Sequence, residues 1–249
     1  MMKKILELLG LSMGLTLLIS VFSAISVAMN WGDNGIISFQ IGAFACAAVL
    51  LFFYMRRREP TLKPFGFKKP QVSVSKALVV YIALVVMVQP VILGADFSLP
   101  VSTYLLILLQ MALVGWVEET LFRGIFFYFL KERQPKVYLL FSSIVFGVLH
   151  VASGLNPETA PMLVVLQIIN ALLLGAVFAV LYYSLRSLYV VMTFHALFNL
   201  FASVTVEGSV QRNVVAVCIL MVCYVVFLVY YLPRVFSLNR KSDLQKLSQ

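Results

Sequence analysis

The sequence is poor in charged residues. Only 12% of its 249 residues are Asp, Glu, Lys or Arg, whereas an ordinary soluble domain carries about 25%. Hydrophobic residues make up 62% of the chain, and the mean hydropathy is +1.00. Long apolar runs recur from one end of the chain to the other. This composition argues against a soluble domain and predicts an all-α, polytopic membrane protein.

Cysteine and histidine are also scarce. The three cysteines, Cys46, Cys218 and Cys223, fall inside apolar runs without metal-ligand spacing, so we interpret them as small buried side chains. The only histidines are His150 and His195, and the sequence has no H-E-x-x-H motif. The usual helical signature of a zinc protease is therefore missing.

The positive charge is not arranged for nucleic acid. The net charge is +9, but the basic residues form short clusters between apolar runs, as loops on one side of a membrane do. We therefore expect membrane lipid around the chain and no nucleic-acid partner. The sequence does not indicate an oligomeric state.

The apolar runs predict eight membrane spans in a single transmembrane domain, residues 1–249, with a motif-bearing core at about 102–206. Most approach the ~20 residues that a helix needs to cross a bilayer. The first exceeds the ~7–15 apolar residues of a signal peptide, so we expect a retained helix. The expected spans are 5–29, 36–55, 77–95, 102–130, 137–152, 162–184, 187–206 and 214–232.

The distribution of Lys and Arg supports this count, because loops on alternate sides of a membrane differ in basic residues. One side collects 17 of the 19, including the connection 56–76 and the tail 233–249. The other side has only Arg212, and Arg123 lies inside the fourth span. We expect both termini in the cytoplasm. The connection 56–76 suits a cytosolic loop or a segment on an anionic membrane surface.

Few acidic residues lie inside the membrane. A charged side chain at mid-bilayer costs at least ~2.5–3.5 kcal/mol, so its default interpretation is functional. Of ten acidic residues, only Glu118 and Glu119 lie deep within a span. At ~1.5 Å rise per helical residue, Glu118, His150 and Asn199 each lie about 20 Å from the cytoplasmic end of their span. Three helices can therefore bring these groups to one depth near the membrane midplane.

Helical spacing separates the two glutamates. Glu119 and Arg123 are four residues apart, with the acid on the favourable N-terminal side, and can form an ion pair. Glu118 is rotated by ~100° from Glu119, so the two carboxylates cannot serve one partner equally. We assign the structural role to Glu119 with Arg123 and leave Glu118 for chemistry.

The histidines share helical faces with further side chains, His150 with Phe146 and His195 with Asn199. A carboxylate in a membrane cavity can act as general base and acid toward water, and an imidazole can share its proton. A His–Asn pair can donate hydrogen bonds to a developing oxyanion. These are the parts of an amide-bond hydrolase without a Ser or Cys nucleophile.

Other chemistries stay open at this point. Two His and one Glu also make a catalytic zinc set, and its ligands would be Glu118, His150 and His195. The hydrolase needs no cofactor, and the sequence leaves the metal undecided. Intramembrane Glu and His also form proton relays in transporters, although no two-half repeat is evident.

Three motifs carry a resemblance to a known family. EETLFRG (118–124), FGVLH (146–150) and HALFN (195–199) match, in order, E-E-x-x-x-R, F-x-x-x-H and H-x-x-x-N. Each motif is short, but three in order, each inside a membrane span, are specific. Over about 115–200 the chain resembles the CPBP family of intramembrane proteases, also called the Abi or CAAX-protease-and-bacteriocin-processing family.

The resemblance implies an eight-helix, glutamate-dependent endopeptidase in which Glu118 and His150 would activate water. The other motif residues would form an oxyanion hole and a supporting pair, His195 with Asn199 and Glu119 with Arg123. Eukaryotic members trim prenylated CAAX proteins, and bacterial members are linked to signal-peptide or bacteriocin processing and to self-immunity. We therefore expect a membrane-associated peptide or lipidated protein as substrate, and the cell membrane of a bacterium as location. The alternatives are a non-catalytic bacteriocin-immunity protein and a proton-coupled transporter.

Overall fold

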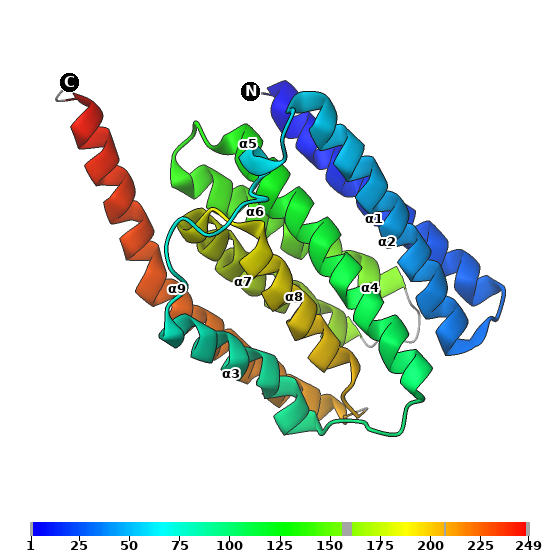
Figure 1. The fold of residues 1–249 in the computed structure, drawn as a ribbon. Helices are drawn as coiled ribbons and strands as arrows, with labels where there is room; N and C mark the ends of the chain where they lie inside the picture. The colour runs from blue at the N-terminus through cyan, green and yellow to red at the C-terminus, as the bar shows by residue number, and fades with distance from the viewer. Residues whose placement is uncertain (1, 156–160, 207, 248–249) are drawn as a thin grey trace.

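The computed structural model describes residues 2–155, 161–206 and 208–247, which form a bundle of long helices with no strand among them. Helices α1 and α2 lie side by side at one edge of the bundle, and α3 and α9 lie at the opposite edge (Figure 1). Helices α4, α6, α7 and α8 fill the middle. The bounds are α1 Met2–Ala28, α2 Gly32–Arg58, α3 Lys76–Leu93, α4 Val101–Glu119, α5 Phe126–Leu130, α6 Pro135–Leu149, α7 Pro161–Leu185, α8 Leu188–Ser203 and α9 Val210–Leu247.

Three short helical segments complete the described chain. They are η1 (Lys63–Phe65), the π-helical segment η2 (Thr120–Ile125) and η3 (His150–Leu155). Segment η2 joins α4 to α5, so that 101–130 is one continuous span of 30 residues. The beginning of α1 and the end of α9 lie at the same end of the bundle (Figure 1).

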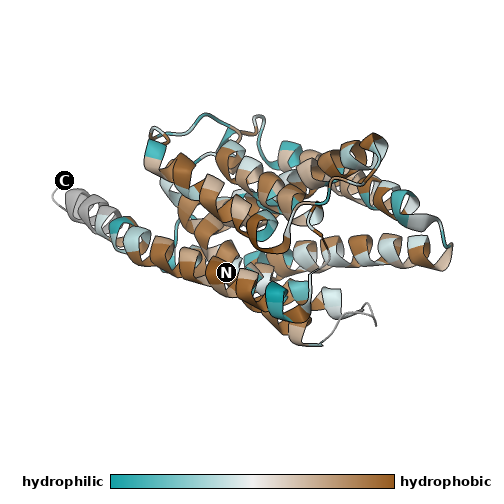
Figure 2. Ribbon diagram, turned by 90° about the horizontal axis from the view of Figure 1, so that it is seen from below, coloured by the Kyte–Doolittle hydropathy of each residue, from teal (hydrophilic) through white to brown (hydrophobic). Residues whose placement is uncertain are grey.

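The helices have the length and composition of membrane spans. Seven of the described helices are long and apolar enough to cross a bilayer, while α8, with 16 residues, is apolar but shorter. Hydrophobic residues run along the helices, and hydrophilic residues gather toward their ends and connections (Figure 2). Each of the eight expected spans corresponds to one of these helices, which confirms the prediction of an all-α, multi-pass membrane protein.

Two helix ends differ from the sequence-based expectation. The fifth span was expected to be helical to residue 152, but α6 ends at Leu149 and His150 begins the 3-10 segment η3. The last helix does not stop near Pro233; α9 contains this proline and continues to Leu247. Proline removes one backbone hydrogen bond from a helix interior, and here that loss does not end the helix. Much of the expected tail is therefore an extension of α9.

The basic connection between α2 and α3 is inserted into the bundle rather than lying free on its surface. Phe65 is fully buried, with its ring centre 4.6 Å from that of Tyr128. The Tyr182 hydroxyl donates to the Phe65 carbonyl at 3.0 Å, and the Leu188 N–H donates to the Gly66 carbonyl at 2.9 Å. These contacts bind the connection to the corner between α7 and α8. Its charge pattern alone did not predict this insertion.

Glycine allows α6 and α7 to pack closely. A Cβ atom at Gly147 would lie 2.7 Å from the Cβ and 2.8 Å from the Cα of Leu172. Small residues at such contacts are typical of membrane helices, where close van der Waals packing replaces the hydrophobic effect. The α6–α7 contact matters for the site because α6 leads directly into His150.

We predict that Gly147→Ala lowers the free energy of unfolding by about 1–3 kcal/mol, because the added methyl overlaps the Leu172 backbone. Thermal unfolding of the purified protein in detergent measures the effect. Gly14→Ala is the matched control, since a Cβ at Gly14 would meet nothing within 4 Å. Equal melting temperatures for the two variants would contradict the close approach of α6 and α7.

Candidate active site

The two glutamates lie where α4 passes into a π-helical turn. At the end of this turn, the Phe126 N–H donates to the Leu121 carbonyl, five residues back. The Ser142 hydroxyl on α6 donates to the Phe122 carbonyl at 2.7 Å. Single π-helical turns within α-helices occur frequently at functional sites. The turn makes the region after Glu119 a candidate site on backbone geometry alone.

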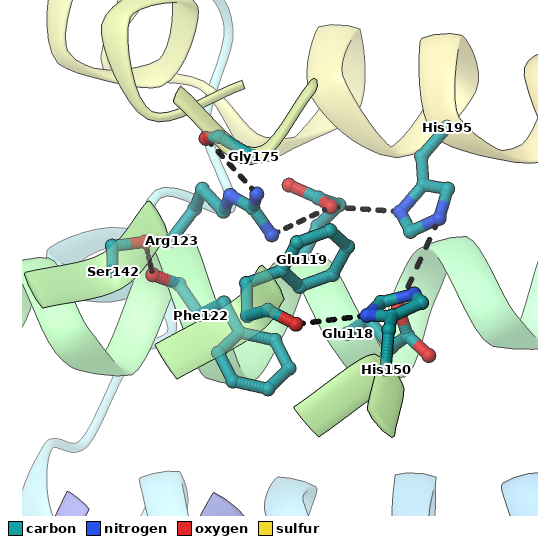
Figure 3. Close-up of polar contacts among 9 residues, drawn as sticks. Glu118, Glu119, Phe122, Arg123, Ser142, His150, Gly175 and His195 are labelled. Carbon is teal, nitrogen blue, oxygen red and sulfur yellow. Dashed lines mark hydrogen bonds and ion pairs between the residues drawn. The ribbon is translucent and has the colours of Figure 1, made fainter. Parts of the chain in front are cut away.

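Glu119 and Arg123 form the expected ion pair (Figure 3). Arg123 Nη1 lies 3.0 Å from Glu119 Oε1, and both side chains are 0% exposed. Arg123 Nη2 donates to the Gly175 carbonyl on α7 at 3.2 Å, and the guanidinium carbon lies 4.3 Å from the centre of the Phe146 ring. The predicted pair is confirmed, and its cation also contacts α6 and α7.

His195 on α8 lies between the two glutamates (Figure 3). Its Nδ1 is 2.8 Å from Glu119 Oε1, and its Nε2 is 3.8 Å from Glu118 Oε2. An ionised carboxylate can only accept a hydrogen bond, so we assign the proton to Nδ1 on the Glu119 side. Helical spacing predicts separate partners for the two carboxylates. The structure instead shows one shared imidazole, bound closely by Glu119 and more loosely by Glu118.

Glu118 and His150 line one cavity of about 200 Å³. The Glu118 side chain is 17% exposed, in contrast to the fully buried Glu119. His150 Nδ1 lies 2.8 Å from the Phe146 carbonyl oxygen, and the two ring centres are 4.8 Å apart. Because a carbonyl only accepts, Nδ1 donates and Nε2 is the nitrogen that can accept a proton in the neutral ring. The predicted association of Phe146 with His150 is present.

Asn199 lies apart from this group. It follows His195 by one turn on α8, is half-buried, and is not among the residues that line the cavity. Its main-chain carbonyl accepts a hydrogen bond from the Ser203 hydroxyl at 2.8 Å. The structure therefore brings His195 to the glutamates and leaves Asn199 one turn away.

The candidate metal ligands are not arranged as a metal site. Within the described ranges, no group of three or more His, Cys, Asp or Glu side chains could hold a metal ion. His195 Nδ1 is held by Glu119, and Nε2 faces Glu118 across 3.8 Å. Glu118, His150 and His195 therefore do not form a three-ligand group in the described part of the chain.

Gly175 on α7 is a packing residue that lies beside the site. A Cβ atom at Gly175 would lie 2.9 Å from Phe146 Cδ1 and 3.4 Å from Arg123 Nη2. The missing side chain lets Arg123 approach the α7 backbone while Phe146 packs beside it. A glycine within an apolar helix often marks such a close approach. The place of Gly175 within an apolar run is therefore the sequence feature that could indicate this contact.

Comparison with known proteins identifies a family over one part of the chain. Residues 100–201, which contain all three motifs, match the family described as Type II CAAX prenyl endopeptidase Rce1-like. Over this segment the chain is similar to the Rce1-like family. The match confirms the resemblance to CPBP proteases and suggests a protease of the CAAX type. No curated protein and no solved structure matches the chain.

The Rce1-like segment supplies only part of the cavity wall. It contributes Glu118 from α4 and Phe122 from η2, together with residues from α6, η3 and α7. The rest of the wall belongs to α1 and α2, which lie outside 100–201. The three motifs therefore include the polar residues Glu118 and His150 of the cavity wall. They do not include the part of the wall that α1 and α2 form.

We predict that Arg123→Ala lowers the free energy of unfolding by about 3–5 kcal/mol, because it leaves the Glu119 carboxylate buried without its cation. Denaturant titration of the purified protein in mixed micelles measures the loss. Arg58→Ala is the control, because the Arg58–Glu7 pair is 34% exposed on each side and such pairs contribute ~0–1 kcal/mol.

The double variant Arg123→Ala, Glu119→Gln separates charge from packing. Removing both charges relieves the unpaired carboxylate, so we expect the double variant to be less destabilised than the sum of its single changes. Strictly additive losses would show that the guanidinium stabilises the protein by packing alone.

Proposed function

We propose that the protein is an intramembrane, glutamate-dependent endopeptidase. Its substrate would be a membrane-associated peptide or a lipidated protein, of the prenylated CAAX type or the bacteriocin or signal-peptide type. One observation carries the proposal: Glu118 borders a cavity together with His150, inside a membrane-spanning segment that is similar to a protease family. A carboxylate and an imidazole at one cavity are the usual means of activating water without a nucleophilic side chain.

Glu118 acts as the general base in this mechanism. It accepts a proton from water while the water oxygen bonds to the carbonyl carbon of the substrate, and the same proton then passes to the leaving nitrogen as the C–N bond breaks. His150 holds the water through Nε2, since its Nδ1 is bound to the Phe146 carbonyl. The partial exposure of Glu118 supports this role, because water and substrate can reach its carboxylate from the cavity.

We propose His195 as the oxyanion donor beside Glu118. Asn199, one turn along α8, is the second donor that the family resemblance implies. His195 Nε2 lies 3.8 Å from Glu118 Oε2 on the reacting side of the ring. Nδ1 donates to Glu119, so Nε2 donates to the oxyanion when the ring is an imidazolium, in which both nitrogens carry a proton. Donors aimed at the oxygen that becomes negative stabilise the transition state more than the ground state. Glu119 and Arg123 act indirectly, by holding the opposite nitrogen of His195.

We propose a cytoplasmic location for both termini, in the cell membrane of a bacterium. The end of the bundle that holds the start of α1 and the end of α9 also holds the connection 59–75 and the turn between α5 and α6. Taken together, the two chain ends, the connection and the turn carry most of the Lys and Arg residues. Basic residues favour the cytoplasmic side of a membrane. Fluorescent reporters fused to each terminus would test the orientation.

We predict that Glu118→Gln and His150→Ala each reduce peptide cleavage by about 10²–10⁴-fold, the range contributed by a general acid–base group. The assay incubates the protein in proteoliposomes with a library of membrane-tethered peptides and detects products by mass spectrometry. Glu132→Gln is the matched control, because Glu132 is exposed in the turn between α5 and α6. Melting temperatures should stay close to that of the wild type.

Two outcomes would count against this mechanism. A wild-type protein that cleaves no peptide in the library, while the variants retain its cellular phenotype, would favour the non-catalytic immunity protein. Loss of wild-type cleavage after treatment with a chelator, restored by zinc, would instead show that a metal activates the water.

A further inference from the structure

Part of the wall of the cavity that Glu118 and His150 line is one face of α1. Leu15, Thr16, Ile19 and Ser20 of this helix line the cavity. Positions i, i+1, i+4 and i+5 project from one side of a helix, so α1 presents a continuous strip to the cavity. Phe44 of α2 also lines the cavity. These residues lie outside the Rce1-like segment.

The other face of α1 is turned away from the protein. Met13 and Leu17 on that face are 66% and 65% exposed. In a membrane such exposed apolar side chains contact lipid. A single helix therefore separates the cavity from the surrounding bilayer, and its two faces have distinct neighbours. Substitutions on the two faces of α1 can be compared directly.

The lining selects against charge. Among the described residues of the lining, Glu118 is the only acid, His150 is the only titratable nitrogen, and there is no Lys or Arg. Hydroxyls supply most of the other polarity: Thr16 Oγ1 donates to the Ser12 carbonyl at 3.1 Å, and Ser153 Oγ donates to the His150 carbonyl at 2.8 Å. Each of these hydroxyls keeps lone pairs that can accept a hydrogen bond. An uncharged side chain on a peptide backbone suits such a lining.

The size of the cavity further limits which groups can occupy it. Its volume is about 200 Å³, below the ~300–1,000 Å³ of pockets that hold whole small-molecule ligands. Together with the position of Glu118, this volume fits one aliphatic side chain next to the bond that is cut. It does not fit a large stretch of substrate.

We propose that α1 forms the specificity subsite of the enzyme, in which Thr16, Ile19 and Ser20 contact an uncharged side chain adjacent to the scissile bond. This inference rests on the proposed protease function. The subsite and the Glu118 carboxylate line one cavity, so the depth of the subsite decides which substrate side chain brings its peptide bond to Glu118. Substrate choice is then determined by a helix outside the segment that defines the family.

The first test measures a ratio of specificities. Ser20→Leu fills the subsite, and Ser20→Ala enlarges it. Peptides with Ala or Leu on each side of the cleaved bond are compared by kcat/KM. One methylene in a hydrophobic pocket changes discrimination by about 10–200-fold, so we expect Ser20→Leu to lower the Leu/Ala ratio at least tenfold. Ser20→Ala should shift the ratio in the opposite direction.

Gly14→Leu is the matched control for this test, since it adds the same side chain to the lipid-facing side of α1, where a Cβ meets nothing within 4 Å. A purely structural effect on α1 would lower kcat/KM for both peptides and leave the ratio unchanged. An unchanged ratio in both Ser20 variants, on both sides of the bond, would overturn the proposal.

The second test does not need catalysis. A photo-crosslinking amino acid is placed at Ile19 or, as control, at Leu17, in the Glu118→Gln background. We expect the membrane-tethered Leu peptide to crosslink at position 19 and not at position 17. Equal crosslinking at both positions, or none at 19, would refute the subsite.

The two proposals can fail separately. A wild-type protein that cleaves no peptide refutes the protease, while crosslinking at position 19 still reports whether the wall binds a peptide. Cleavage that depends on Glu118 but ignores every change at Ser20 refutes the subsite and leaves the protease intact.

Discussion

The ion pair between Glu119 and Arg123 sets the geometry of the whole site. Lipid offers no hydrogen bonds to either group, so each must find further partners within the protein. Arg123 reaches the Gly175 carbonyl on α7, and Glu119 binds His195 on α8. One pair of charges on the α4–η2 span therefore fixes the relative positions of three membrane spans. Glu118 is placed at the cavity as a consequence of its neighbour's contacts.

The two adjacent glutamates show how different surroundings give identical side chains different roles. Glu119 is enclosed by a cation and an imidazole, and Glu118 faces a cavity that it shares with His150. Neighbouring residues on a regular helix point in different directions by geometry alone. The π-helical turn that follows them adds a second change of direction, because it offsets the residues after Glu119 from the regular α-helical positions. Two carboxylates with the same chemistry can therefore serve structure and reaction side by side.

Features that depend on neighbours along the chain could be predicted from the sequence. The length of each apolar run predicted a membrane helix, and the spacing of four residues predicted the Glu119–Arg123 ion pair. Contacts between distant segments could not be derived in this way. Nothing in the motif around His195 indicates that its ring contacts both carboxylates, or that Asn199 stays away from the cavity. The burial of Phe65 likewise depends on helices more than fifty residues away in sequence.

The insertion of the connection around Phe65 and Gly66 also bears on what kind of unit the family segment is. The Tyr182 hydroxyl and the Leu188 N–H, both inside 100–201, donate to carbonyls that lie outside it. Without those carbonyls, two polar groups would lose their partners where the buried Phe65 side chain now packs. The stretch that is recognised by sequence similarity therefore relies on the rest of the chain to satisfy these two donors. A fragment limited to 100–201 would expose both donors together with the surface that Phe65 covers.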